Sequence, residues 1–512
     1  MRFNQKLYIF LLIAFFLSNH AVLCAQKKVI YQADILEYDE AFYPGIRRLI
    51  GNVIFQHENT KIYSDSAYFW ESQQIIEAYG KEVQIVTEDS VFIFGKKLRY
   101  DGILKLAILT TNVRLIQKEA TLYTDTLYYD LNIDKAYYNC GGKIIDQENT
   151  LISRKAYFYT RLNEAYFKDS VVLHNPEYDI YSDTLKFNTA TQIAYIFGPT
   201  DIISKESTIF CKNGWYNTQN DNAYFSEDAV ISSPPNLLYG DEIYYDRRNK
   251  TGKAFHNVIM SDTSQRLIAM GNYAEYDENR GYSFVTDSTL LIYYESGDSL
   301  FLHCDTVYAQ RDSLKNIETI RAYHDVAFFR ADIQGRCDSM VYIAKDSLLY
   351  LYKNPVLWAD SNQITADTIY FFIPDNRDYI GYFKKDAFFI SALFDETEFN
   401  QVKGKDMTAY FIDRILKHID VNGNVESLYF LLEGDTAVIG INLSFANRVT
   451  VFLEDNQIQT IHYIDKPEGT IYPYSQLPEN EKFFKGFNWR SEIRPLSKED
   501  VFIRREVVNE KK

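Results

Sequence analysis

The sequence contains few of the residues that break or crosslink regular structure. In 512 residues there are 11 prolines, 22 glycines and 5 cysteines. Together with the many Tyr and Phe residues, the small numbers of proline and glycine favour strands over helices or disorder. An excess of basic residues is also missing, because the formal net charge is −16. A nucleic-acid partner is therefore not expected, since such partners require a basic footprint.

Long hydrophobic runs are absent except near the N-terminus. An apolar run from Leu7 to Leu17 follows a basic start and precedes Ala25. It is too short to span a membrane and is typical of a secretory signal peptide. We predict that residues 1–25 are removed on export to the periplasm. A lipid-anchored Cys24 is the alternative, although Leu23 stands where that signal needs a small residue.

Patterns that carry catalysis or metal binding are missing as well. The histidines are scattered without zinc-ligand spacing, and no phosphate-binding loop, GxSxG, HExxH or dinucleotide motif is present. We therefore expect no enzyme activity, cofactor or metal. Among the mature cysteines, Cys211, Cys304 and Cys337 occupy a column of small residues, which favours a packing role. Cys304 and Cys337 stand in the same register of adjacent repeats, and a disulfide between them is the alternative.

Aromatic residues, by contrast, are abundant, with 42 Tyr and 35 Phe, and they recur in a repeat. The segment 122–129 returns with small changes as 180–187, and 151–158 fits the same template. The template is apolar, any, small, charged, any, apolar, any, aromatic. Such internal repeats decide the architecture of a chain.

We number each repeat from its mostly charged residue, the central position. The central positions are Asp34, Asp65, Lys96, Asp125, Arg154, Asp183, Lys212, Asp241, Asn272, Asp305, Asp338, Asp367 and Asp406. Four residues later stand Tyr38, Phe69, Tyr100, Tyr129, Phe158, Phe187, Tyr216, Tyr245, Tyr276, Ala309, Tyr342, Phe371 and Tyr410. The residue before the central position is small in every repeat but the last, which has Lys405.

The apolar positions change parity at the central residue. They are odd before it (−3, −1) and even after it (+2, +4). Because side chains alternate faces along a strand, the change predicts a bulge or corner at the central position. The second half of each repeat reads as a polar turn, a strand and a third apolar piece such as Val171–Leu173. We predict an all-β, β-solenoid-like stack of about thirteen repeats of 29–33 residues.

The central charges alternate in sign from Asp65 to Asp241. Stacked neighbours of opposite sign would support one another, so we interpret this column as a structural ladder. The later run Asp305, Asp338, Asp367 and Asp406 lacks basic partners. A bound cation is the alternative there, but no glycine-containing calcium loop accompanies these residues.

The repeat resembles a known family. Gly51-Asn52-Val53-Ile54-Phe55 followed by Ile62-Tyr63-Ser64-Asp65-Ser66-Ala67-Tyr68-Phe69 is similar to the hallmark of the OstA/LptA family of lipopolysaccharide export proteins. The resemblance recurs around Asp125, Asp183 and Asp241 and more loosely as far as Asp406. It implies a twisted β-jellyroll whose apolar interior shields the acyl chains of lipopolysaccharide on their way across the periplasm.

The resemblance also implies partners. These are the lipid A acyl chains, an inner-membrane export complex and an outer-membrane translocon with related jellyroll domains. End-to-end self-association and association with the outer membrane are further expectations. The length of the chain departs from a single bridge module and favours a long bridge of residues 26–440. Residues 441–512, with prolines 467, 473, 478 and 495, are expected to form a C-terminal β, capping and docking segment.

We call the apolar +2 and +4 columns the trough residues and predict that they line the lipid-binding interior. They are Phe69, Tyr100, Tyr129, Phe158, Phe187, Tyr216, Tyr245, Tyr276, Leu98, Leu127, Leu185 and Ile243. Acyl chains gain about 0.8 kcal/mol per buried CH₂, so an apolar wall can hold them without specific polar contacts. The alternative is a structural or adhesive β-solenoid at the cell surface that binds no lipid.

Overall fold

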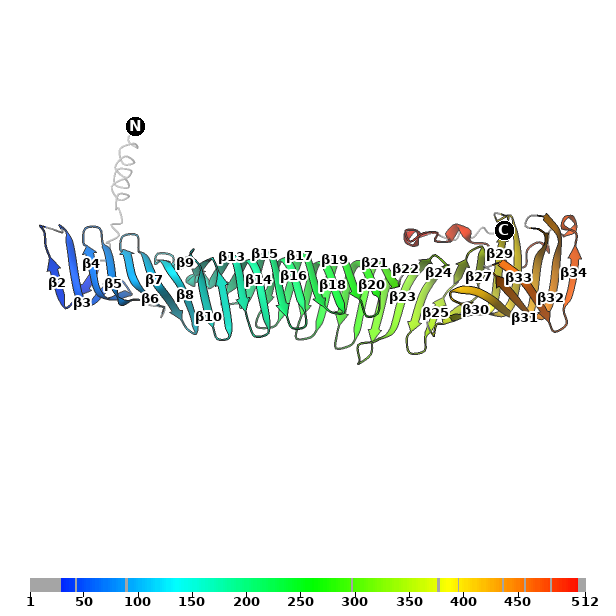
Figure 1. Cartoon of the computed structure of the whole chain (residues 1–512), viewed down its shortest axis with the longest axis horizontal. Helices are drawn as coiled ribbons and strands as arrows, with labels where there is room; N and C mark the ends of the chain where they lie inside the picture. Colours follow the sequence, from blue (N-terminus) through cyan, green and yellow to red (C-terminus); the bar gives the residue numbers. More distant parts are fainter. Residues whose placement is uncertain are drawn as a thin grey trace, which may run out of the picture. The chain divides into compact units, whose positions relative to one another are not determined.

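A computed structural model of the chain describes residues 29–41, 44–87, 91–295, 298–374, 378–394, 396–434, 437–454, 457–478 and 481–504. The chain divides into two compact units, Met1–Lys205 (unit 1) and Glu206–Lys512 (unit 2). The described part of both units consists of antiparallel strands and contains no α-helix, which confirms the predicted all-β class (Figure 1). The predicted signal peptide, residues 1–25, lies outside the described residues.

Unit 1 is a ladder of antiparallel strands in which most strands pair with their neighbours in sequence, while the first two both pair with the third. Its strands are β1 (Ile30–Gln32), β2 (Ile35–Tyr38), β3 (Ile46–His57), β4 (Thr60–Trp70), β5 (Ile75–Val86), β6 (Phe92–Asp101), β7 (Leu106–Gln117), β8 (Ala120–Asp130), β9 (Lys135–Tyr138), β10 (Gly142–Asp146), β11 (Asn149–Ser153), β12 (Lys155–Tyr159), β13 (Glu164–His174), β14 (Tyr178–Asn188) and β15 (Ile193–Ser204). A 3₁₀ turn, η1 (Thr160–Leu162), precedes β13.

Unit 2 continues the same pattern. Its strands are β16 (Thr208–Asn217), β17 (Asn222–Ser233), β18 (Asn236–Asp246), β19 (Thr251–Asp262), β20 (Leu267–Asp277), β21 (Tyr282–Glu295), β22 (Asp298–Arg311), β23 (Ile317–Arg330), β24 (Ile333–Ile343), β25 (Leu348–Tyr352), β26 (Val356–Ala359), β27 (Asn362–Thr365), β28 (Thr368–Phe372), β29 (Tyr379–Leu393), β30 (Glu398–Ile412), β31 (Ile415–Glu433), β32 (Ala437–Glu454), β33 (Gln457–Ile464) and β34 (Glu468–Tyr472). Strand pairing therefore runs past residue 440, and short 3₁₀ turns follow it: η2 (Tyr474–Gln476), η4 (Ser491–Ile493) and η5 (Asp500–Phe502).

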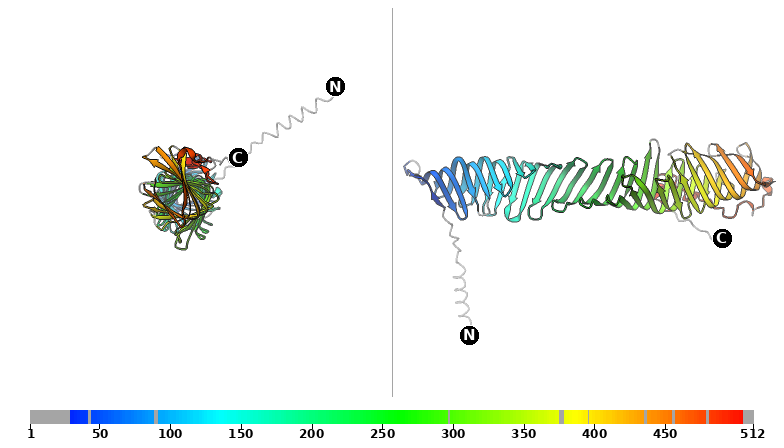
Figure 2. Two further views of the ribbon diagram at one scale, coloured as in Figure 1. Left: turned by 90° about the vertical axis from the view of Figure 1, so that its right-hand side faces the viewer. Right: turned by 90° about the horizontal axis from the view of Figure 1, so that it is seen from below.

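The predicted corner at the central position is present. In β4, Ile62 and Ser64 are buried before Asp65, and Ala67 and Phe69 are buried after it. The pairing register with β3 and with β5 shifts at the same place. Each strand is thus bent (Figure 2), and its two halves enclose the buried side chains. Where the corner interrupts the ladder, one bent strand is described as two, as in β9 and β10 or β11 and β12.

The return strand of most repeats turns its own corner, which the sequence pattern did not reveal. Two consecutive residues there have positive φ, for example Asp169 (64°) and Ser170 (56°) in β13. The same pairs occur at Thr111–Asn112, Glu227–Asp228, His256–Asn257, Asp287–Ser288, His324–Asp325 and Lys385–Asp386. The expected third apolar piece, Val171–Leu173, is therefore not a separate strand but the far half of β13. A repeat consists of two bent strands.

The register of the last repeat corrects the column assigned from the sequence. Asp406 pairs with Lys384, which also pairs with Thr368, the residue after a central position. The central residue of this repeat is therefore Lys405, and the small residue before it is Gly404. Tyr410 consequently does not belong to the inward aromatic column; its ring stacks on His418 with centroids 4.2 Å apart.

The two same-register cysteines are free thiols, and the alternative of a disulfide is wrong for this structure. Cys304 lies on β22 and Cys337 on β24, with β23 between them. Two strand spacings separate their Cα atoms by about 9.6 Å, beyond the reach of a disulfide. Burial raises the pKa of each thiol to about 12. Both side chains pack in the apolar core of unit 2, as the small-residue column predicts.

Candidate functional site

The trough residues all lie on the inward faces of their units. In unit 1, Phe69, Tyr100, Tyr129, Leu98 and Leu127 are at most 3% exposed. Phe158 and Phe187 are partly exposed, whereas Leu185 is 5% exposed. In unit 2, Ile243 is fully buried, and the aromatic trough residues there are partly exposed: Tyr216, Tyr245 and Tyr276.

Exposure along the trough follows distance from the corner. In β14 the positions beside the corner, Ser182 and Leu185, are buried, whereas the more distant Ile180 and Phe187 are partly exposed. The same holds in unit 2 for β16, where Cys211 is buried and both Ile209 and Tyr216 are partly exposed. In β4, β6 and β8 even the distant positions are buried. The interior is thus filled by side chains in that part of unit 1 and accessible along β14 and along β16 to β20.

Some of the polar groups that face inward have partners, whereas Ser64 Oγ is buried without one. The Tyr100 hydroxyl lies 2.6 Å from His57 Nδ1, and the Tyr138 hydroxyl lies 2.7 Å from Ser153 Oγ. Burial raises the pKa of Tyr138 to about 12 and raises that of Tyr100 as well. These phenols therefore stay neutral at physiological pH, and the inner wall carries no phenolate charge.

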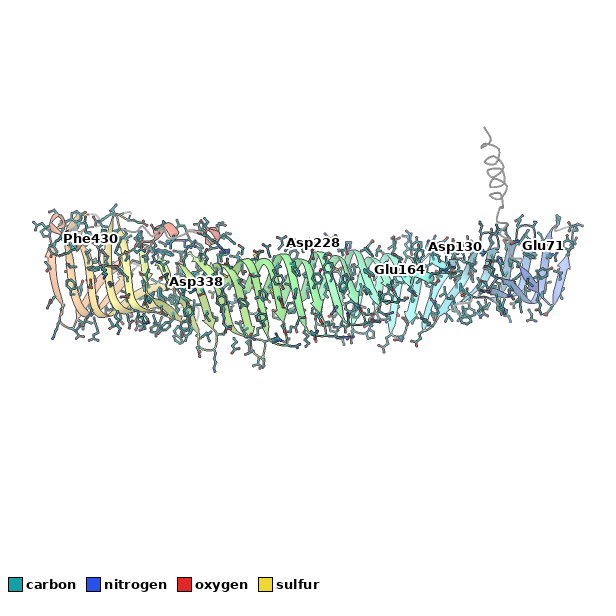
Figure 3. All side chains as sticks on the ribbon, turned by 180° about the vertical axis from the view of Figure 1, so that it is seen from behind. Glu71, Asp130, Glu164, Asp228, Asp338 and Phe430 are labelled. Carbon is teal, nitrogen blue, oxygen red and sulfur yellow. The ribbon has the colours of Figure 1, made fainter. Side chains whose placement is uncertain are left out.

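The central charges bind corners instead of one another. The Asp65 carboxylate accepts a hydrogen bond from the Lys81 backbone N–H (2.7 Å), and that of Asp241 accepts one from Asn257 Nδ2 (2.9 Å). Lys212 Nζ donates to the Asp228 carboxylate (2.5 Å); Asp228 is labelled in Figure 3. Among the described residues no ion pair joins two central positions. A return strand separates them, so the alternating charges anchor neighbouring corners and do not form the direct ladder expected from the sequence.

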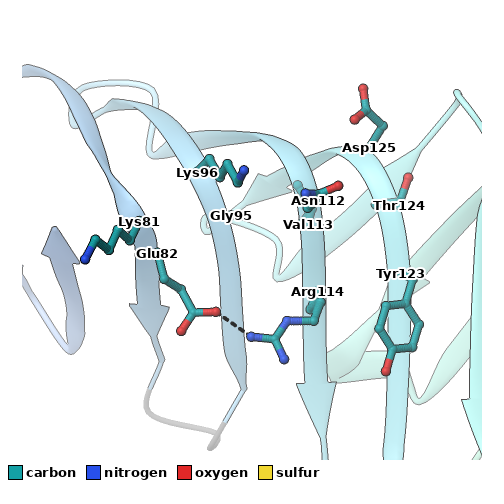
Figure 4. A pocket seen from close by; sticks show the side chains of 10 residues that line it. All are labelled: Lys81, Glu82, Gly95, Lys96, Asn112, Val113, Arg114, Tyr123, Thr124 and Asp125. Carbon is teal, nitrogen blue, oxygen red and sulfur yellow. Dashed lines mark hydrogen bonds and ion pairs between the residues drawn. The ribbon is translucent and has the colours of Figure 1, made fainter. Parts of the chain in front are cut away.

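A polar pocket of about 600 Å³ lies over the corners of β5 to β8 in unit 1 (Figure 4). It is lined by Lys81, Glu82, Gly95, Lys96, Asn112, Val113, Arg114, Tyr123, Thr124 and Asp125. Arg114 pairs with Glu82 across it. The pocket carries charges of both signs and includes none of the trough residues.

Metal ligands do not gather anywhere in the described part of the chain, where no group of three or more His, Cys, Asp or Glu could hold an ion. Within the same residues, no helix has the length and apolarity needed to span a membrane. The inward apolar columns are therefore the most extensive feature with a plausible binding chemistry.

Comparison with known proteins gives a match to a family model and matches to solved structures. A family model described as OstA-like protein matches residues 25–183 and 181–238. Among solved structures, LptH from Pseudomonas aeruginosa, described as the LptA-homologous periplasmic component of the conserved lipopolysaccharide transport device, is 18% identical. That match covers 20% of this chain and 76% of LptH with a TM-score of 0.19, too low to carry a structural argument. No protein of curated function matches significantly.

Proposed function

We propose that this chain, whose residues 25–238 match the OstA-like family model, is a periplasmic bridge that binds lipopolysaccharide. On this proposal it shields the acyl chains during transport from the inner to the outer membrane, and it performs no catalytic step. Its partners are an inner-membrane export complex and an outer-membrane translocon, and it associates with the outer membrane at one end.

The observation that carries the proposal is the apolar inner wall that recurs in both units. Each repeat except the one centred on Lys212, which has Gly214, contributes an apolar +2 side chain, and all but one of the first twelve contribute an aromatic +4 residue. Where these are partly exposed, as at Phe187 and Tyr245, acyl chains can contact them while the surrounding strands exclude water. A fourteen-carbon chain buried along such a wall would gain on the order of 10 kcal/mol from its CH₂ groups before ordering costs.

End-to-end self-association is part of the same proposal. The first strands of unit 1 expose Ile30 (66%) and Ile35 (53%), and the last strand of unit 2 exposes Ile471 (67%). Such terminal strands offer unpaired backbone groups to another sheet.

Site-specific photocrosslinking in cells tests lipid binding. Crosslinkers at Phe187 and Tyr245 should trap lipopolysaccharide, because both side chains face inward and are partly exposed. Their matched controls are the outward-facing tyrosines Tyr181 (46% exposed) and Tyr244 (43% exposed) in the same strands. Crosslinks only at the outward tyrosines would contradict the assignment of the trough.

The structural or adhesive solenoid remains the second candidate, and the filled interior at β4, β6 and β8 is the observation that favours it. Depletion of the protein separates the two. The bridge predicts that lipopolysaccharide builds up in the inner membrane, whereas the adhesive solenoid predicts unchanged lipid distribution and no copurified lipid.

A further inference from the structure

The C-terminal segment of unit 2 runs back over the outer face of the strands that precede it. We call the described residues 474–478 and 481–504 the tail. Leu477 and Phe484 pack on β29 to β32, Ile493 packs on Val356 and Trp358 of β26, and the Phe502 ring contacts His303 of β22. The tail thus crosses the strands in the reverse of their sequence order, and Figure 1 shows part of it beside β24 to β29.

Two glutamines form the same pair of hydrogen bonds with the backbone of the tail. Gln401 Nε2 donates to the Lys482 carbonyl (2.8 Å), and its Oε1 accepts from the Phe484 N–H (3.0 Å). Gln363 Nε2 donates to the Asn488 carbonyl (2.7 Å), and its Oε1 accepts from the Arg490 N–H (2.8 Å).

In each case one amide pairs with the carbonyl of residue i and the N–H of residue i+2, as a neighbouring strand would. This contact selects an extended backbone but not its side chains.

The glutamines occupy one structural column. Gln334, Gln363 and Gln401 each stand three residues before the small residue of their repeat, namely Cys337, Ala366 and Gly404, on the outward face. They are nevertheless 3%, 0% and 1% exposed. An outward amide that is fully buried requires a partner, and the tail supplies it.

Apolar side chains beside this column anchor the tail. The Phe399 ring lies 5.2 Å from that of Phe487 and 5.3 Å from that of Trp489, between ring centroids. Phe388 and Phe430 are 4% and 2% exposed although they lie outside the central core. This face therefore combines side-chain amides that hydrogen-bond to a backbone with aromatic side chains that contact aromatic residues of the tail. Extended peptides are bound at sheets in this way.

The tail fits this face imperfectly at its arginines. Arg490 Nε and Trp489 Nε1 are buried without a hydrogen-bond partner. Arg494 reaches only neutral acceptors, Gln334 Oε1 (2.9 Å from Nε) and the Asp360 carbonyl (2.6 Å). Burial lowers the pKa of both guanidinium groups. Glu492 acts on Arg490, and Asp360 and Glu396 act on Arg494, but burial outweighs their attraction. A buried charge with an unpaired Nε–H opposes docking, so a segment without Arg490 would bind more tightly.

We propose that the outer face of β22 to β32 is a docking groove for an extended peptide segment of a second polypeptide, and that the tail is its tethered, displaceable occupant. The incoming segment presents backbone at the two glutamines and aromatic side chains at the positions of Phe484 and Trp489. It carries an uncharged residue in place of Arg490. This inference is independent of lipid binding, because the groove lies on the opposite face of the strands from the trough.

The test uses the full chain with a protease site inserted after Pro473, so that cleavage leaves the tail bound but untethered. The probe is a fluorescein-labelled peptide of residues 474–504, followed by anisotropy. The cleaved protein should bind it, and the uncleaved protein should bind it far more weakly because the tethered tail competes at high effective concentration.

Peptide variants sharpen the test without altering the protein. Arg490→Met in the peptide should tighten binding about tenfold or more, since it removes a charge that burial opposes and an Nε–H without a hydrogen-bond partner. Phe484→Ala should weaken it by at least about tenfold. Failure of the peptide to bind the cleaved protein, or weaker binding by the Arg490→Met peptide, would overturn the proposal.

A variant of the groove provides the complementary measurement. Gln363→Met leaves the Asn488 carbonyl and the Arg490 N–H unpaired and should weaken peptide binding about tenfold. The matched control is Gln84→Met at an outward position of β5 in unit 1, which should leave binding unchanged. Equal effects of the two substitutions would contradict the role of the glutamine column.

Discussion

Gly271 provides a quantitative test of why the residue before the central position is small. A Cβ added there would lie 2.7 Å from the Thr286 carbonyl oxygen and 2.7 Å from Val285 Cγ1. Thr286 directly precedes Asp287 and Ser288, the left-handed pair at the corner of β21, so this backbone cannot shift without disturbing the corner. We expect Gly271→Ala to destabilise the local structure by about 1–3 kcal/mol, as overpacking does.

Gly95 occupies the same column in unit 1 and is the matched control. Its added Cβ would meet the Thr110 oxygen at 3.4 Å and Leu109 Cβ at 3.5 Å, which are nearly ordinary contacts. Gly95→Ala should therefore be neutral or stabilising by up to about 1 kcal/mol, because alanine has fewer unfolded conformations than glycine.

Hydrogen exchange followed by mass spectrometry measures both effects locally. Peptides that cover β20 and β21 should lose protection by about 5- to 150-fold in Gly271→Ala, whereas peptides that cover β6 and β7 should keep their protection in Gly95→Ala. If both substitutions were tolerated equally, the small column would have a different cause from close backbone approach.

Two further predictions concern buried ionisable groups. Asp262 is buried, which alone would raise its pKa, but hydrogen bonds from Ser264, Arg311 and the Gln265 N–H outweigh burial and hold the pKa below its usual range. The ionised Asp262 therefore stabilises the fold above the usual carboxyl pKa, and this stabilisation is lost as the pH falls through the lowered value. Asp262→Asn should lower the free energy of unfolding by about 1–3 kcal/mol at pH 7. In urea titrations the difference in unfolding free energy between the variant and the original protein should vanish in strong acid, and a difference that does not change with pH would refute the lowered pKa. For the cysteines, alkylation of the native protein at pH 8 without reductant should modify the exposed Cys140 alone, and denaturation should add Cys211, Cys304 and Cys337; protection of the last two after denaturation would indicate a disulfide.

Much of the repeat could be predicted from local chemistry. The change of parity at Asp65 and its equivalents predicted the corner, because alternation of side chains is a property of a single strand. The position of the trough residues on one face followed from the same alternation. What the pattern misassigned was the last repeat, since Lys405 and Asp406 differ by one residue and only pairing with Lys384 decides which is central.

The interpretation of the charges and cysteines needed knowledge of which strands are neighbours. Counting repeats as adjacent rungs placed Cys304 beside Cys337 and Lys212 beside Asp241. The intervening return strand separates both pairs and gives Lys212 a partner, Asp228, in its own corner. That corner depends on two residues with positive φ, a conformation that Glu227 and Asp228 adopt without any sequence signature.

The sequence by itself determined that this protein is a stack of bent β-strands with an apolar inner face, because periodicity, residue size and aromatic content are local and act within one repeat. Only the tertiary structure decided how far the interior is filled, which charges meet, and that the outward Gln334, Gln363 and Gln401 are buried by a segment about 80 to 160 residues later in the chain. These features are contacts between distant parts of the chain, and they exist only once strand order and register are fixed.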